Sequence, residues 1–93
     1  MNIDKRIKIR YRGNVQGVGF RFAVKHQAEH YDISGFVRNE PDGSVLIVAE
    51  GGQGCLDSFL DAIERSHVGA HIRDKSIEEE EYRGEFKGFG IDY

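Results

Sequence analysis

An alternation of apolar and polar residues opens the chain between positions 5 and 12. Apolar side chains occupy every second position, at Ile7, Ile9 and Tyr11, and basic residues stand at Lys8, Arg10 and Arg12. Because successive side chains of a strand point to opposite faces, this period predicts a β-strand with one buried face.

The apolar period changes to that of a helix in two later segments. In the first, the recurring positions are Phe20, Val24, the pair Gln27–Ala28 and Tyr31. This spacing predicts an amphipathic helix over about residues 21–31. In the second, the apolar residues are Leu56, Phe59, Leu60 and Ile63. They predict a helix over about residues 55–66 that begins after a glycine cluster.

Short apolar segments predict the remaining strands. Residues 33–39 and 44–50 are separated by Glu40-Pro41-Asp42-Gly43, where proline presets one backbone angle and glycine permits another. We therefore expect a hairpin of two strands, the second rich in β-branched residues. A weaker segment at 71–81 and the alternation of Phe89, Ile91 and Tyr93 predict a further strand and a last one.

The order of these elements is β-α-β-β-α-β, with one additional strand near the end. It predicts an α+β, ferredoxin-like sandwich in which an antiparallel sheet carries both helices on one face. Right-handed crossovers would place the first and third strands side by side in the middle of the sheet. This fold supports many unrelated activities, so it predicts no function by itself.

Size and charge narrow the class of protein. The chain has 93 residues, a net charge of -3 and a single cysteine. We expect one domain over residues 1–93, acting as a monomer, with no nucleic acid as its main partner. No apolar run has the length of a membrane span, and the first residues lack a signal-peptide core. One cysteine forms no internal disulfide, so the cytoplasm is the predicted location.

A glycine-rich loop, residues 13–21, joins the first strand to the first helix. Glycine permits backbone angles at which several N–H groups point to one place, and a helix N-terminus adds unpaired donors. Arg21 stands in the first helical turn, where the helix dipole disfavours a cation, which points to a functional reason for it. Together these features predict a phosphate-binding cradle. The spacing fits neither the Walker nor the dinucleotide-binding pattern, and the loop holds no cysteine nucleophile.

The motifs of the first half of the chain resemble those of the acylphosphatase family. The resemblance rests on Gly13-x-Val15-Gln16-Gly17-Val18-Gly19-Phe20-Arg21, Gly35-Phe36-Val37-x-Asn39, Asp42-Gly43-x-Val45 and Glu50-Gly51. It runs in register over a little more than half of the chain. Asn14 departs from the family, in which a basic residue often follows the first glycine, and this substitution leaves the cradle intact.

The resemblance implies hydrolysis of acyl phosphates to carboxylate and inorganic phosphate, without a cofactor or metal ion. It implies that Arg21 and the loop amides bind the phosphate and that Asn39 orients the attacking water. The implied phosphate-binding residues are Val15, Gln16, Gly17, Val18, Gly19, Phe20 and Arg21. Taken without the family, Asn39 is more readily explained as a turn-initiating residue. The alternative function is a non-catalytic module that binds phosphate on the same fold.

One motif elsewhere is compatible with a metal site. His26-Gln27-Ala28-Glu29-His30 matches the H-x-x-E-H pattern of some zinc proteases. A catalytic zinc site also needs a third protein ligand and an open cleft. Both histidines fall outside the apolar stripe of the predicted helix, so we expect them to face solvent without a resident metal ion.

Overall fold

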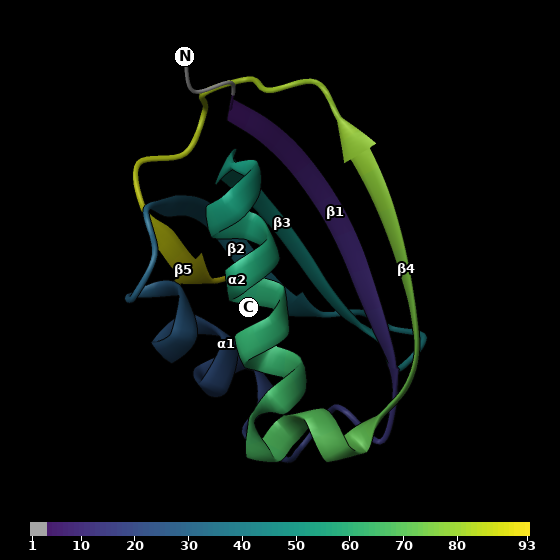
Figure 1. Ribbon diagram of the computed structural model, residues 1–93. Coiled ribbons are helices and arrows are strands. Elements are labelled where there is room, and N and C mark those ends of the chain that lie inside the picture. Colours follow the sequence, from purple (N-terminus) through teal and green to yellow (C-terminus); the bar gives the residue numbers. More distant parts are fainter. Residues whose placement is uncertain (1–3) are drawn as a thin grey trace.

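Eight elements make up the computed structural model, which describes residues 4–93 (Figure 1). The strands are β1 (Asp4–Gly13), β2 (Ile33–Asn39), β3 (Val45–Gly52), β4 (Ile72–Glu80) and β5 (Phe89–Ile91). The helices are α1 (Phe20–Ala28), α2 (Gln53–Arg65) and the short 3₁₀ helix η1 (His67–His71).

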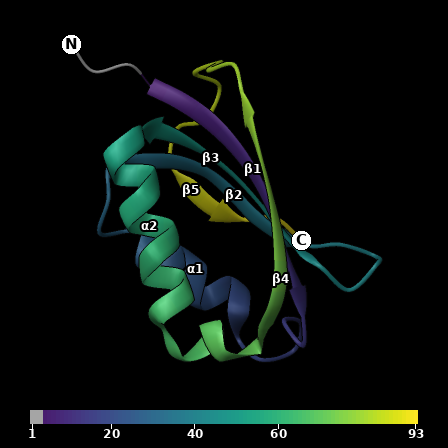
Figure 2. The same cartoon turned by 45° about the vertical axis from the view of Figure 1, so that its right-hand side comes forward.

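The five strands form one sheet in the order β4-β1-β3-β2-β5. β1 lies antiparallel to β3 and β4, and β2 lies antiparallel to β3. The first and third strands are therefore neighbours in the middle of the sheet, as predicted. β5 is the additional strand, and it pairs with β2 in parallel, which makes the sheet mixed. Both α-helices pack on one face (Figures 1 and 2), which confirms the ferredoxin-like α+β fold.

The core lies between the sheet and the helices and uses the side chains that the periodicity predicted. The buried residues are Ile7, Ile9 and Tyr11 of β1, Phe20, Val24 and Ala28 of α1, and Leu56, Phe59 and Ile63 of α2. The buried Tyr11 hydroxyl donates a hydrogen bond to Glu64 at 2.8 Å, which ties β1 to the end of α2. Burial, and then this bond to a carboxylate, raise the pKa of Tyr11 well above its usual range.

α1 is shorter than the apolar period predicted, because it ends at Ala28. The N–H groups of His30 and Tyr31 donate to the carbonyl oxygens three residues earlier, at 3.0 and 3.2 Å, so the chain tightens into turns there. Tyr31 nevertheless packs on Phe59, with ring centroids 6.3 Å apart. Its contact with the core explains why it keeps the helical spacing although it lies beyond the helix.

The end of β1 fixes where the glycine-rich loop begins. Gly13 has a φ of 132°, and a Cβ at this position would overlap the carbonyl oxygen of His71. The same oxygen accepts a hydrogen bond of 3.1 Å from the N–H of Asn14. The close approach of these backbones therefore requires glycine and places the start of the loop against the end of η1.

Candidate active site

The loop between β1 and α1 is held open by two glycines in the left-handed region. Gly17 and Gly19 have φ values of 78° and 79°, and Gly19 is the N-cap of α1. Val15 is fully buried and anchors the loop in the core. Within residues 4–93, none of the backbone N–H groups from Val15 to Gly19 donates a hydrogen bond. Together with the unpaired N–H groups of the first helical turn, they are free donors for an anion.

A cavity of about 260 Å³ opens beside this loop. Its lining residues are Val15, Gly17, Gly19, Phe20, Arg21, Phe22 and Asn39. The structure therefore brings Arg21 and Asn39, which come from different elements, to the same cavity. Of the other predicted phosphate-binding residues, Gln16 and Val18 do not line it. Phe22 does, although the sequence motifs did not indicate it.

Arg21 carries a positive charge that no acidic side chain of the described residues offsets. Other arginines form ion pairs, such as Arg10 with Glu40 and Arg12 with Asp74, whereas no ion pair among residues 4–93 includes Arg21. No carboxylate lines the cavity, and the first turn of α1 contains no acidic residue. The guanidinium carbon lies 5.0 Å from the ring centroid of Tyr93, within cation–π range. This contact was missed by sequence reasoning, because no local pattern links the two positions.

Asn39 is the last residue of β2, and its backbone pairs with that of Val45 in β3. Its side-chain oxygen Oδ1 is buried and accepts no hydrogen bond from the described residues. An unpaired buried acceptor costs about 1–3 kcal/mol, so such atoms are usually satisfied by a ligand or a water molecule. Oδ1 can therefore accept a hydrogen bond from a water molecule held in the cavity.

The side chain of Gln16 joins the loop to the turn that follows Asn39. Its Nε2 donates to the carbonyl oxygens of Glu40 at 2.8 Å and Ser44 at 2.9 Å. The turn is further closed by Asp42, which accepts hydrogen bonds from the hydroxyl and the N–H of Ser44. The bond from the Ser44 hydroxyl, and to a lesser extent the bond from its N–H, lower the pKa of Asp42 below its usual value. Sequence reasoning had assigned to Gln16 only a backbone donor.

Chemically, the cavity combines fixed backbone donors, one uncompensated guanidinium and one neutral amide oxygen. Donors and a cation favour a tetrahedral anion such as a phosphoryl group. An amide holds a water molecule without changing its own charge. The arrangement therefore suits binding of a phosphoryl group with a water molecule beside it.

The histidine pair of α1 lies apart from this cavity. His26 and His30 are exposed, and their ring centroids lie 5.3 Å apart. Among residues 4–93, no three His, Cys, Asp or Glu side chains are grouped so that they could hold a metal ion. No helix in that part of the chain is long and apolar enough to cross a membrane.

Comparison with known proteins gives a consistent result across the chain. A family model described as Acylphosphatase matches residues 7–91. A curated acylphosphatase of Salinibacter ruber is 36% identical over 88 residues, which cover 95% of this chain and 93% of that protein.

Solved structures agree with the sequence matches. A crystal structure of acylphosphatase from Bacillus subtilis is 35% identical, has a TM-score of 0.87, and is matched over 96% of this chain and 99% of that one. Full-length HypF, solved in a phosphate- and nucleotide-bound form, is 27% identical with a TM-score of 0.86. That match covers 100% of this chain but 12% of HypF, so the same fold also occurs as a small part of a larger protein.

Proposed function

The chain belongs to the acylphosphatase family and is an acylphosphatase, and from this premise we propose that Arg21, Asn39 and the loop Val15–Phe20 form its active site. The observation that carries the proposal is the cavity itself, which unites an unpaired guanidinium, unpaired loop amides and an unpaired amide oxygen. The alternative of a non-catalytic phosphate-binding module is not favoured by the relatives, which are named for the enzyme activity.

Arg21 and the loop amides act on the phosphoryl group. A guanidinium offers two parallel N–H donors to two phosphoryl oxygens, and the amides are fixed before substrate arrives. Charge in the transition state spreads over the equatorial oxygens of the phosphoryl group, where these donors point. Because the leaving group is a carboxylate, its departure needs little protonation, and the scheme requires neither a strong general acid nor a metal ion.

Asn39 acts on the nucleophile. Its Oδ1 accepts a hydrogen bond from the water molecule and orients it for in-line attack on phosphorus. The proton of the water passes to an oxygen of the substrate's own phosphoryl group, since no carboxylate or histidine lines the cavity. The products are a carboxylate and inorganic phosphate, and phosphate in turn competes with substrate for the cradle.

The domain organisation, oligomeric state, cellular location and partners of the enzyme are also proposals. We expect residues 1–93 to act as one domain and as a monomer in the cytoplasm, on small-molecule acyl phosphates and not on nucleic acid. The single sheet shared by the described elements supports one domain, and the net charge of -3 argues against nucleic acid. The free thiol of Cys55 is compatible with a reducing compartment.

Hydrolysis of benzoyl phosphate in the presence of a chelator tests the assignment. Arg21→Ala should lower the rate by at least ~10²–10³-fold and weaken inhibition by phosphate, since it removes a preorganised electrostatic contact. Arg21→Lys should be nearly as damaging, because a point charge lacks the guanidinium fork. Asn39→Ala should lower turnover while leaving inhibition by phosphate mostly intact.

Arg65→Ala is the matched control for the loss of an arginine. Arg65 is exposed at the end of α2 and pairs only with Asp61 among the described residues. Near wild-type turnover in Arg21→Ala or Asn39→Ala would overturn the site. A folded wild type that binds phosphate without hydrolysing the substrate would instead support the binding module.

A further inference from the structure

Two exposed aromatic side chains lie beside Arg21, and one of them lines the cavity. Among the described residues, the exposed large hydrophobic side chains are Phe22, Ile77, Tyr82 and Tyr93. Two of these four border Arg21: Phe22 lines the same cavity, and the ring of Tyr93 contacts the guanidinium at 5.0 Å. Their exposed fractions are 62% for Phe22 and 85% for Tyr93, so neither ring is needed to fill the core.

The position of Phe22 on α1 has no explanation in the packing of the fold. The buried side of the helix is formed by Phe20, Val24 and Ala28. At about 100° per residue, Phe22 lies about 200° around the helix from Phe20 and points away from the core. A polar residue would serve folding equally well there. Phenylalanine instead places an apolar surface at the cavity, one residue after the arginine that grips the phosphoryl group.

The chemistry of an acyl phosphate gives this surface a use. Such a substrate has a charged phosphoryl half and an acyl half joined by one oxygen. The loop amides, Arg21 and Asn39 offer polar contacts, which suit the phosphoryl half and the water molecule. The acyl half is left to contact the side chains at the border of the cavity, where the apolar surface lies.

We propose that Phe22 and Tyr93 form a subsite for the acyl group, which selects acyl phosphates with an aromatic or long apolar acyl group over acetyl phosphate. The proposal rests on the function proposed above. Contact between an aromatic ring of the protein and one of the substrate removes apolar surface from water, whereas an acetyl group covers little of either ring.

The ratio of kcat/KM for benzoyl phosphate to kcat/KM for acetyl phosphate tests this subsite. Both substrates share the phosphoryl half, so any shift of Arg21 cancels in the ratio. We expect Phe22→Ala and Tyr93→Ala each to lower the ratio, Phe22→Ala by about tenfold. Phe22→Leu, which keeps an apolar side chain, should lower it less. Alanine favours helices, so Phe22→Ala is expected to fold.

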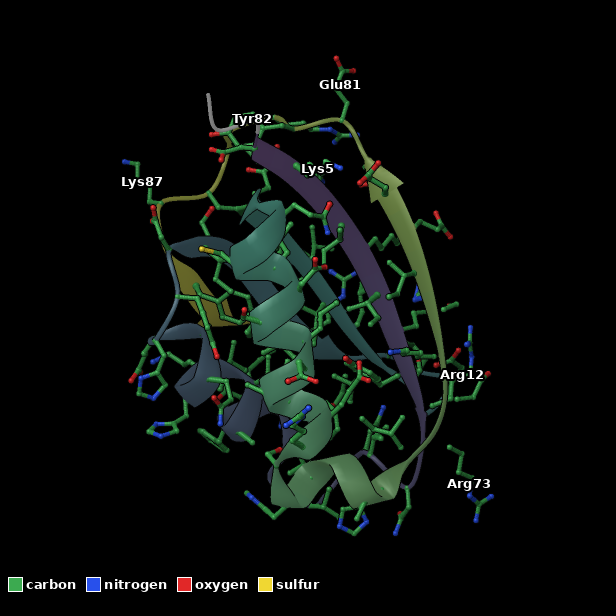
Figure 3. All side chains as sticks on the ribbon, in the orientation of Figure 1. Lys5, Arg12, Arg73, Glu81, Tyr82 and Lys87 are labelled. Atoms are coloured by element: carbon green, nitrogen blue, oxygen red, sulfur yellow. The ribbon has the colours of Figure 1, made fainter. Side chains whose placement is uncertain are left out.

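Tyr82→Ala is the control for removal of an exposed aromatic ring. Tyr82 is 47% exposed and lies near Lys5 at the start of β1, whereas the loop leaves the other end of that strand (Figure 3). We expect this variant to keep the wild-type ratio.

The two proposals fail in distinguishable ways. If wild type and Arg21→Ala hydrolyse both substrates equally well, the active site is wrong. If Arg21→Ala is inactive but the ratio is the same in wild type, Phe22→Ala and Tyr93→Ala, the active site stands and the acyl subsite is wrong. A ratio lowered equally by Tyr82→Ala also contradicts the subsite, because the effect would not be local.

Discussion

At the scale of single residues, the side chain of Gln16 links the glycine-rich loop to the turn that follows Asn39. Its Nε2 bonds the carbonyl oxygens of Glu40 and Ser44, which belong to the turn directly after Asn39. The loop proposed to hold the phosphoryl group and the strand end proposed to hold the water molecule are thus joined by one side chain. In the proposed mechanism the distance between the two reactants depends on this link.

Substitution of Gln16 should therefore affect turnover more than phosphate binding. Gln16→Ala removes two hydrogen bonds, and we expect kcat to fall about tenfold, with inhibition by phosphate changed little. Gln16→Glu should be worse, because a carboxylate would face two carbonyl oxygens. Steady-state kinetics with benzoyl phosphate and phosphate measure both quantities.

Gln53→Ala is the control, because Gln53 also donates from Nε2 but does so to exposed Asp57 on α2. It should have wild-type kcat. A Gln16→Ala enzyme with unchanged kcat would show that the link does not position Asn39.

The roles of single residues were predictable only in part. Physical reasoning from the sequence predicted a phosphate cradle with Arg21, because glycine angles and a helix N-terminus are local properties. The catalytic role proposed for Asn39 comes from the family resemblance, since its local context equally suits a turn. Phe22 and Tyr93 were missed because exposure and the contact between Arg21 and Tyr93 follow from the fold and not from any spacing.

At the scale of elements, a buried charge network fixes the segment between β4 and β5. Glu50 in β3 is 2% exposed and accepts hydrogen bonds from the N–H groups of Arg83 and Gly84 at 2.8 and 3.1 Å. It also contacts Arg6, which reaches Glu80 and Glu85. The network lies at the start of β1, whereas the cradle follows the end of that strand.

Removal of Glu50 should therefore cost stability and spare activity. Glu50→Ala leaves two backbone donors without their partner and removes one of the three carboxylates that contact Arg6, and we expect a loss of about 2–3 kcal/mol in the free energy of unfolding. Urea unfolding followed by circular dichroism measures the loss of stability. The value of kcat at low urea concentration, where the variant is folded, shows whether activity is spared.

Glu78→Ala, at an exposed site on β4, should change stability by less than about 0.5 kcal/mol. A Glu50→Ala protein as stable as wild type would mean that the network does not hold the segment.

The sequence predicted which elements form better than how the last of them pair. An element with one buried face shows a periodic pattern of apolar residues in the sequence. This holds for β1, with Ile7, Ile9 and Tyr11, and for the apolar stripes of the two helices. β5 has three residues, and its alternation predicts which side chains face the core but not which strand it pairs with. Its pairing with β2 arises because residues 81–88 cross from β4 at one edge of the sheet to the other edge.

At the scale of the whole molecule, β4 leaves one edge of the sheet open. In the described residues it pairs with β1 alone, and its side chains are exposed over nearly its whole length. An open edge of this length can pair with another chain unless charges oppose it. Arg73 of β4 and Glu81, directly after β4, project outward at this edge (Figure 3). We therefore expect charged side chains to oppose pairing of this edge with another chain.

Apolar substitution on β4 should remove this protection. Ser76→Val combined with Glu78→Val creates a Val-Ile-Val run around exposed Ile77, and we expect oligomers at concentrations where wild type has none. Light scattering after size-exclusion chromatography measures the change.

Glu29→Val combined with Ser58→Val makes the same chemical changes at two exposed sites outside the sheet, one directly after α1 and one on α2, and should not associate. If the two double variants behave alike, general hydrophobicity and not the strand edge would be responsible.

The central place of β1 also bears on when the protein becomes active during its synthesis. β1 is made before β3 and β4, yet it lies between them, and the N–H of Asn14 after it bonds the carbonyl oxygen of His71. The ribosome must therefore release the chain through His71 before the contact that places the start of the loop can form. Pairing between such distant segments is slow, because the intervening chain must be ordered before the contacts form. A growing chain thus carries Arg21 and Asn39, the proposed catalytic residues, before it is able to use them.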